Sequence, residues 1–359
     1  MMELIGGEKG VHVANEPDVV RIKREKRERR LESAPTGMTR KRFLTFLGAG
    51  SAALAAGSAG ASTMGVPMGS TGGRDAPVIG GIAEAQAAQA SRLPFTPIEP
   101  TGEDDVVLPE GFKYDILRKW GDDVAGDDAP YGYNNDFVAY FPIDALEGGQ
   151  NSQDGILWVN HEYPDPKWVS EYQDGDKTPE QIDQEKASVG GSIFRVRRQG
   201  DTWSFVEDDQ YNRRIDATTP MDLTGPAAGS EEMEGADEAI GTLANCGGGV
   251  TPWNTVLTCE ENFQDYYGES SGADESRYRW LDDSDNAQPP EHYGWIVEVD
   301  PFDPESKPRK HTWLGRRRHE NATVRLSDRG RVVVYTGHDQ EDQCIYKFVS
   351  SGTFDPNDR

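Results

Sequence analysis

The chain has 359 residues and a formal net charge of −26 at pH 7, and 35% of its residues are hydrophobic. A surface this acidic repels nucleic acid and anionic membranes, which excludes both as partners, but it suits divalent cations. The 40 glycines and 22 prolines argue against a helical bundle, and the eight tryptophans argue against a disordered chain.

The first 62 residues are net basic and predict an export signal. Residues 39–62 read TRKRFLTFLGAGSAALAAGSAGAS, in which a basic cluster precedes Phe-Leu and an apolar Ala/Gly-rich segment. The order resembles a twin-arginine signal, with Lys41 in place of the second arginine. We expect export to the periplasm, the cell surface or the medium, with translation starting at Met1 or Met38. A membrane anchor is the alternative, although the segment is short and rich in glycine.

Residues 63–104 are rich in Gly, Ala, Ser and Pro and are predicted to form a linker. Apolar residues first recur after this point, so we expect one folded domain over residues 105–359. Short apolar runs separated by Gly, Asp, Asn and Pro predict β-strands. These runs are GILWVNHEY, GGSIFRVRR, TWSFVED, NTVLTCEE, YGWIVEVD, RVVVYTG and CIYKFVS. Only TPEQIDQEKAS, which begins at Thr178, predicts a helix. The fold class is therefore all-β, either a sandwich or a propeller.

The stretch NCGGGVTPWNTVLTCEENF, residues 245–263, combines thiols, carboxylates and three consecutive glycines. Glycines allow close approach of a ligand or of another chain segment. In the strand TVLTCE, alternation places Glu260 on one face and Cys259 and Glu261 on the other. The two glutamates start out pointing apart, and we expect the twist at the strand end to aim both at one rim.

Three cysteines in an exported chain leave one thiol unpaired after any disulfide. A Cys246–Cys259 disulfide is one interpretation of this stretch. The other is that a thiol serves as a metal ligand, which holds it as a thiolate.

Three further clusters carry His and acidic residues at predicted strand ends. They are Asn160-His161-Glu162, His319-Glu320, and His338-Asp339 with Glu341 and Asp342. Each cluster alone is more often a solvated loop. If the strands share one axis the clusters converge, and together they favour a hard cation such as calcium or high-valent iron.

Several blocks resemble the PhoX-type alkaline phosphatase family, in the same order as in the family. They are LPEGFKYDIL, GPAAG, GTLANCGGGVTPWNTVLTCEENF, RRHENATV and VVVYTGHDQEDQCIYKFVS. The resemblance implies a six-bladed β-propeller, a cofactor of iron and calcium ions, hydrolysis of small-molecule phosphate monoesters, and twin-arginine export without stable membrane insertion.

The resemblance also implies site residues. Cys246 matches the family's iron-binding cysteine, and Glu261 and Glu320 match metal-binding glutamates. Glu260 and Asp339 are further metal candidates. The implied chemistry is metal-assisted displacement at phosphorus, and no side chain is assigned a catalytic role.

Two features depart from the family pattern. His338 and Gln343 replace two acidic positions, and the chain reaches Arg359 without the family's later Arg-Pro-Glu segment. We therefore expect only the N-terminal part of the ring, impaired activity, and a separate C-terminal half as partner. A non-catalytic, calcium-stabilised secreted module is the alternative function. The third possible function is that of a secreted β protein that is stabilised by a disulfide and binds no metal.

Overall fold

The computed structural model describes residues 95–126, 129–267 and 278–356. The predicted signal and most of the predicted linker lie outside these residues. Contacts group the chain from Lys113 to Arg359 into one unit, and the described segment that ends at Phe112 belongs to another. Within the described residues, no helix combines the length and apolar character needed to cross a bilayer.

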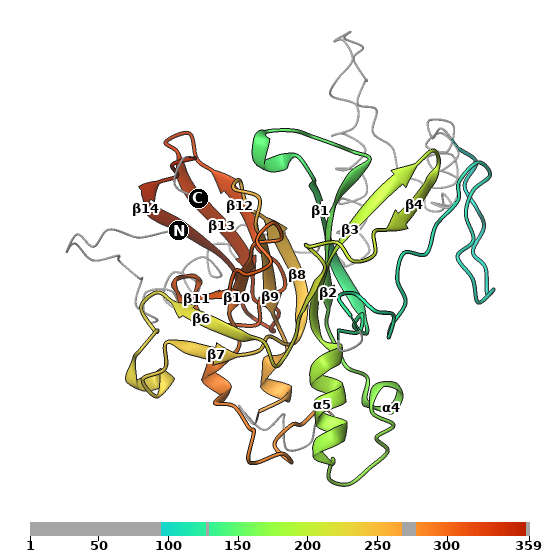
Figure 1. Cartoon of the computed structure of the whole chain (residues 1–359). Coiled ribbons are helices and arrows are strands. Elements are labelled where there is room, and N and C mark those ends of the chain that lie inside the picture. Colours follow the sequence, from blue (N-terminus) through green and yellow to red (C-terminus); the bar gives the residue numbers. More distant parts are fainter. Residues whose placement is uncertain (1–94, 127–128, 268–277, 357–359) are drawn as a thin grey trace, which may run out of the picture. The chain divides into compact units, whose positions relative to one another are not determined.

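The larger unit consists of three sheets (Figure 1). The first has the order β1-β2-β3-β4, with β5 also paired to β3. Its strands are β1 (Asn135–Pro142), β2 (Asp154–His161), β3 (Gly190–Gln199), β4 (Thr202–Phe205) and β5 (Arg213–Ile215). All its pairings are antiparallel. Antiparallel neighbours can be joined by short connections, which suits the Gly- and Asp-rich segments between the apolar runs.

The second sheet has the order β7-β6-β11-β10-β9-β8. Its strands are β6 (Pro220–Thr224), β7 (Glu238–Ile240), β8 (Asn245–Val250), β9 (Val256–Glu260), β10 (Ile296–Val299) and β11 (Arg309–His311). The β6–β11 pair is parallel and the other pairs are antiparallel. The third sheet has the order β12-β13-β14, formed by β12 (Thr323–Leu326), β13 (Arg331–Gly337) and β14 (Ile345–Thr353). The predicted all-β class is confirmed.

The predicted helix is α5 (Pro179–Ser188). Thr178 Oγ1 accepts a hydrogen bond from the Gln181 backbone N–H, and the Thr178 backbone N–H donates to the Gln181 side-chain oxygen, so a capping box begins the helix. The other helices among the described residues are short: α4 (Pro166–Val169), η1 (Ala145–Glu147), η2 (Glu231–Met233), η3 (Phe263–Asp265), η4 (Pro290–His292) and η5 (Thr312–Leu314).

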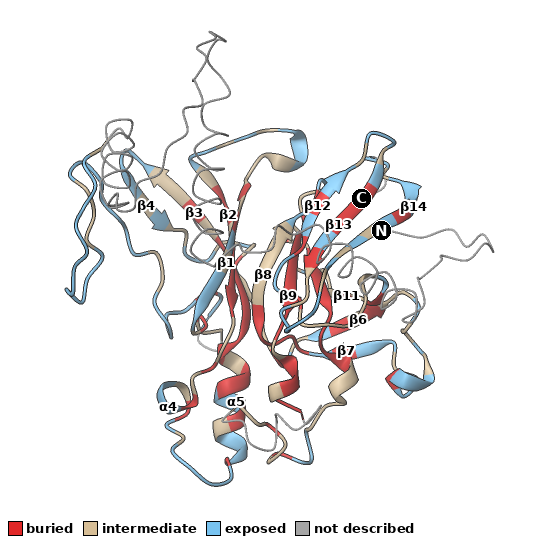
Figure 2. Cartoon of the chain, turned by 180° about the vertical axis from the view of Figure 1, so that it is seen from behind, coloured by how far each residue is buried: buried red, intermediate tan, exposed pale blue. Residues whose placement is uncertain are grey.

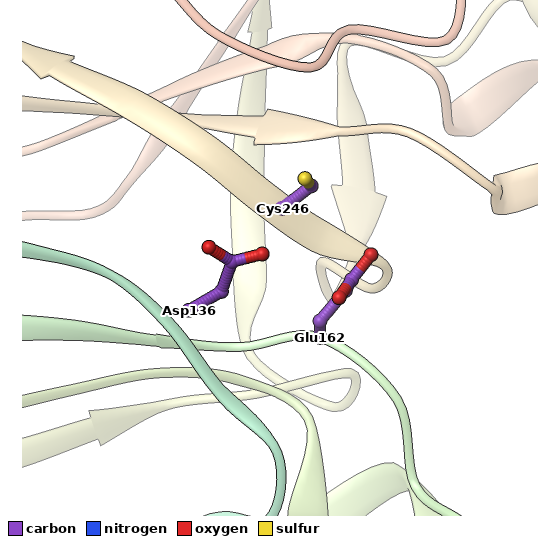
Figure 3. A group of neighbouring side chains, drawn as sticks. All are labelled: Asp136, Glu162 and Cys246. Carbon is purple, nitrogen blue, oxygen red and sulfur yellow. The ribbon is translucent and has the colours of Figure 1, made fainter. Parts of the chain in front are cut away.

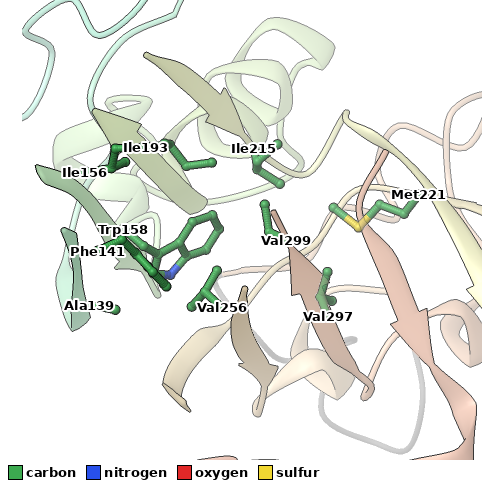
Figure 4. Packing of buried hydrophobic residues seen from close by; sticks show 10 residues of the cluster. All are labelled: Ala139, Phe141, Ile156, Trp158, Ile193, Ile215, Met221, Val256, Val297 and Val299. Atoms are coloured by element: carbon green, nitrogen blue, oxygen red, sulfur yellow. The ribbon is translucent and has the colours of Figure 1, made fainter. Parts of the chain in front are cut away.

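The second sheet is buried on both faces along β9 (Figure 2). One face packs against the first sheet, where Val256 and Val297 meet Trp158 and Phe141 (Figure 4). On the other face, Leu257 packs with residues of the third sheet. A central strand of this kind reads as a continuous apolar run, which explains why β9 was predicted from its sequence.

Glu298 on β10 is a buried carboxylate held by three side chains. Trp253 Nε1 and Thr255 Oγ1 donate to one oxygen, and His311 Nε2 lies 2.8 Å from the other. Burial by itself raises the pKa of Glu298, but the contact with His311 and the hydrogen bonds from Thr255 and Trp253 outweigh it and lower the pKa to about 2. Ionised Glu298 is therefore part of the folded structure.

This lowered pKa predicts acid sensitivity. Ionised Glu298 stabilises the fold above its ordinary pKa of 4.5, and that stabilisation disappears as the pH falls toward about 2. Protonation of Glu298 alone should lower the free energy of unfolding by roughly 3 kcal/mol between about pH 5 and pH 2. Urea unfolding measured at successive pH values checks this, because Glu298→Gln should flatten the slope. Equal slopes in the two proteins would contradict the prediction.

Candidate metal centre

A thiol and two carboxylates from three different segments meet in one cluster. Asp136, Glu162 and Cys246 point toward one another (Figure 3), and each offers a ligand atom within 4.8 Å of the others. Metal–ligand bonds of about 2.0 to 2.5 Å place ligands around one ion at such separations. The spacing therefore fits a single cation.

Irregularities in two strands aim these side chains. The register of β1 against β2 shifts between Asn135 and Val138, and the register of β8 against β9 shifts between Asn245 and Gly248. An extra residue in one strand bends it and redirects its side chains, as in a β-bulge. Asp136 and Cys246 both lie in these shifted stretches.

Asn160, at the end of β2, fixes the irregular stretch of β8. Its amide donates to the backbone carbonyls of Cys246 and Gly247. Its own oxygen accepts from Trp158 Nε1 and Thr258 Oγ1, and the side chain is fully buried. Asn160 therefore has a structural task beside the cluster, and Glu162, two residues later, supplies the carboxylate.

The glycine run allows β8 to touch both neighbouring sheets. β8 contacts β1 and β2 of the first sheet and β12 of the third. A Cβ at Gly247 would overlap the carbonyl oxygen of Glu320, and one at Gly249 would overlap that of Ala322. The bare backbone beside Cys246 thus serves close packing of another chain segment, which was one of its two predicted uses.

Glu261 and Asp339 extend the cluster. Glu261 directly follows β9 and is anchored by its backbone N–H, which donates to the Ala244 carbonyl at 3.0 Å. Its carboxyl group interacts with Cys246, Glu162 and Asp339. Asp339 follows β13 and is exposed. Each of the three sheets therefore contributes at least one acidic side chain near the cluster.

Burial and neighbouring acidic groups raise the pKa values of Glu162, Glu261 and Cys246. Burial, followed by the charge of Asp136, raises the pKa of Glu162 to about 7. Burial, followed by contact with Asp339, raises the pKa of Glu261 to about 7. Burial and the neighbouring acids also raise the pKa of the Cys246 thiol. A bound cation favours the ionised form of each of these groups.

Glu260 lies away from the cluster, although it neighbours Glu261 in sequence. Its carboxylate is fully buried and accepts from Lys310 Nζ at 2.7 Å and from the backbone N–H groups of Gly294 and Trp295. Thr242 Oγ1 also donates to it at 2.9 Å. The two glutamates keep the opposed directions expected from strand alternation, and the expectation that the strand end aims both at one rim is wrong.

The other predicted metal candidate, Glu320, has an exposed side chain, and only its backbone is seen against Gly247. Its neighbour His319 is buried, with ring nitrogens 2.8 Å from Thr336 Oγ1 and from the Gly315 carbonyl. His319 therefore links β13 of the third sheet to the loop at Gly315. Burial lowers the pKa of its ring to about 3.

All three cysteines are free in the structure. Cys259 is fully buried in the apolar core beside Leu257 and Ile296. A sulfur packed among hydrocarbon groups behaves as a small hydrophobe. Cys246, on the polar side, is the thiol available to a metal.

A scan against family models finds a match to alkaline phosphatase PhoX over residues 93–359. The chain belongs to the PhoX alkaline phosphatase family. A solved structure, Pseudomonas fluorescens PhoX in complex with vanadate, a transition state analogue, matches with a TM-score of 0.63 and 31% identity. The match covers 73% of this chain and 51% of that chain, so the chain spans about half the length of that PhoX. The comparison with curated proteins found no match.

The match confirms the predicted PhoX family and, with the three-sheet structure, the predicted propeller class. Sequence reasoning missed one member of the cluster. Asp136 lies in the run YNNDF at the start of β1, which gives no sign of the register shift beside this exposed acid. Glu162 was noted at a strand end but not assigned as a ligand.

Proposed function

We propose that the chain is a secreted, metal-dependent PhoX-like phosphatase that hydrolyses phosphate monoesters. The observation that carries the proposal is the cluster of Asp136, Glu162 and Cys246, with ligand atoms within 4.8 Å of one another. Membership of the PhoX family supports the reaction class.

The donor set fits iron and calcium. A thiolate is a soft ligand that suits iron, and carboxylate oxygens suit calcium. Cys246 with Glu162 and Asp136 would hold iron, and Glu261 and Asp339 would supply further carboxylate oxygens. Glu320 stays a proposed ligand from the family resemblance, and its exposed carboxylate is free to turn. Glu260 is a weaker proposal because its oxygens already have protein partners.

Bound metal ions would clamp phosphate oxygens and activate an oxygen nucleophile. The chain's own residues contribute positioning. The two shifted strand stretches hold Asp136 and Cys246 toward one point, and Asn160 prevents β8 from relaxing into regular pairing. Glu162 and Glu261 interact across the cluster and offer further carboxylate oxygens there.

Metal analysis joined to an assay tests the proposal. The full chain is purified, loaded with iron and calcium, and assayed with a chromogenic phosphate monoester at alkaline pH. We expect both metals to be retained after gel filtration, and a chelator to abolish hydrolysis. Parallel turnover measurements on Pseudomonas fluorescens PhoX test the expected impairment.

Other outcomes decide between the alternatives. Calcium retained without iron or hydrolysis would replace the phosphatase with a non-catalytic, calcium-stabilised module. Retention of neither metal, with all thiols accounted for by mass spectrometry, would overturn both metal functions.

We also propose export by the twin-arginine route, supported by the basic cluster and the apolar segment in residues 39–62. N-terminal sequencing of secreted protein should give a start after residue 62. A mature protein that begins at Met1 or Met38 would favour a membrane anchor instead.

A further inference from the structure

Tyr163 links the two acidic segments of the candidate metal centre. It directly follows Glu162, and Asn262 directly follows Glu261. Asn262 Nδ2 donates to the Tyr163 hydroxyl oxygen at 2.6 Å. The residue after each acid thus contacts the residue after the other.

The ring of Tyr163 is held as firmly as its hydroxyl. It stacks on Tyr278 with centroids 5.2 Å apart and an interplanar angle of 16°. A stacked ring fixes the direction of the hydroxyl, and the Asn262 amide occupies its acceptor side. The hydrogen bond and the stacked ring together fix Tyr163 relative to Asn262.

We infer that Tyr163 is a positioning residue, whose hydrogen bond with Asn262 holds the segments of Glu162 and Glu261 together so that both carboxylates face the metal. Partners that hold metal ligands in place tune the site, and losing one typically costs 10 to 100-fold in metal affinity. The inference rests on the proposed function, because it needs a metal at Cys246 and Glu162.

Tyr266 provides a matched control. It also stacks on Tyr278, at 5.6 Å and 21°, and it is fully buried. Within the described part of the chain its hydroxyl has no hydrogen-bond partner. Tyr163→Phe and Tyr266→Phe therefore remove the same atom from two stacked rings, and only one of them touches the metal cluster.

Titration of the metal-depleted full chain with Co²⁺ alone tests the inference, because absorption from cobalt–thiolate charge transfer reports binding at Cys246. Tyr163→Phe should weaken the dissociation constant by about 10 to 100-fold, whereas Tyr266→Phe should stay within about twofold of the wild type. Asn262→Ala removes the same hydrogen bond from its other side and should weaken binding in the same direction. The Asn262→Ala variant also tests the inference if Tyr163→Phe fails to fold, which the urea midpoint of Tyr163→Phe would reveal.

The outcomes separate the two claims. A wild-type chain without the cobalt–thiolate band would overturn the proposed metal centre, and the inference with it. A wild-type chain that binds Co²⁺, with folded Tyr163→Phe and Asn262→Ala variants that bind equally tightly, would overturn the inference alone.

Discussion

Replacing Cys246 with serine is expected to abolish iron binding and to lower phosphate monoester hydrolysis by on the order of a hundredfold or more. Cys246 contributes the sulfur of the cluster, and a serine hydroxyl does not ionise to replace a thiolate as a soft ligand. The backbone of β8 should be unaffected, because it is fixed by Asn160 and by contacts at the glycines. Metal content by mass spectrometry and the rate of hydrolysis are the measurements.

Cys344→Ser is the matched control. Cys344 is also a free, half-buried thiol, but it is not a member of the cluster. The Cys344→Ser variant should keep the iron content and the rate of hydrolysis of the wild type, and that result would exclude a general effect of removing a thiol. A Cys246→Ser protein with the iron content of the wild type would exclude Cys246 as a ligand.

Replacing Glu260 with glutamine is expected to destabilise the fold by about 3 to 5 kcal/mol, the usual cost of breaking a buried ion pair. Lys310 and Glu260 are both fully buried, and their charged atoms lie 2.7 Å apart. Burial lowers the pKa of Lys310, and Glu260 is the group that opposes this. Removing the carboxylate charge leaves an ammonium group in the core with no anion to balance it. Urea unfolding measures the loss.

Two further proteins sharpen this test. Lys307→Met breaks exposed pairs with Asp222 and Glu238 and should cost less than about 1 kcal/mol. The double variant Glu260→Gln with Lys310→Met should recover much of the lost stability, because no charge stays buried alone. Metal content per folded molecule should not change in Glu260→Gln. A loss of iron at unchanged stability would instead make Glu260 a ligand.

Apolar strands were predictable from the sequence because their side chains carry the signal. The runs that became β2, β3, β9, β10, β13 and β14 are rich in Val, Ile and aromatic residues. β8 was not predicted as a strand, because the final valine is the one residue of this kind in Asn-Cys-Gly-Gly-Gly-Val. Its extended conformation comes from pairing with β9 and from close contact with Glu320 and Ala322, which are distant in sequence.

The candidate centre was predictable in part for a similar reason. Cys246 and Glu261 stand out beside glycines and at a strand end, and strand alternation separated Glu261 from Glu260. Alternation could not reveal that Lys310, fifty positions away in the sequence, lies 2.7 Å from the Glu260 carboxylate and donates a hydrogen bond to it. Nor could it reveal the register shift at Asp136, or that Asp136 lies close to Glu162 and Cys246. Both depend on tertiary packing.

The placement of the cluster's ligands has a consequence for biogenesis. Asp136 is on β1, Cys246 is on β8, and Asp339 follows β13, so the proposed ligands come from all three sheets. A chain still emerging from the ribosome offers these groups one at a time, and isolated ligands hold a metal weakly. Pairings between residues so distant in sequence are slow to form. Under the proposed function, the ion that is bound would therefore be decided in the compartment where the third sheet docks, by whichever metals are available there.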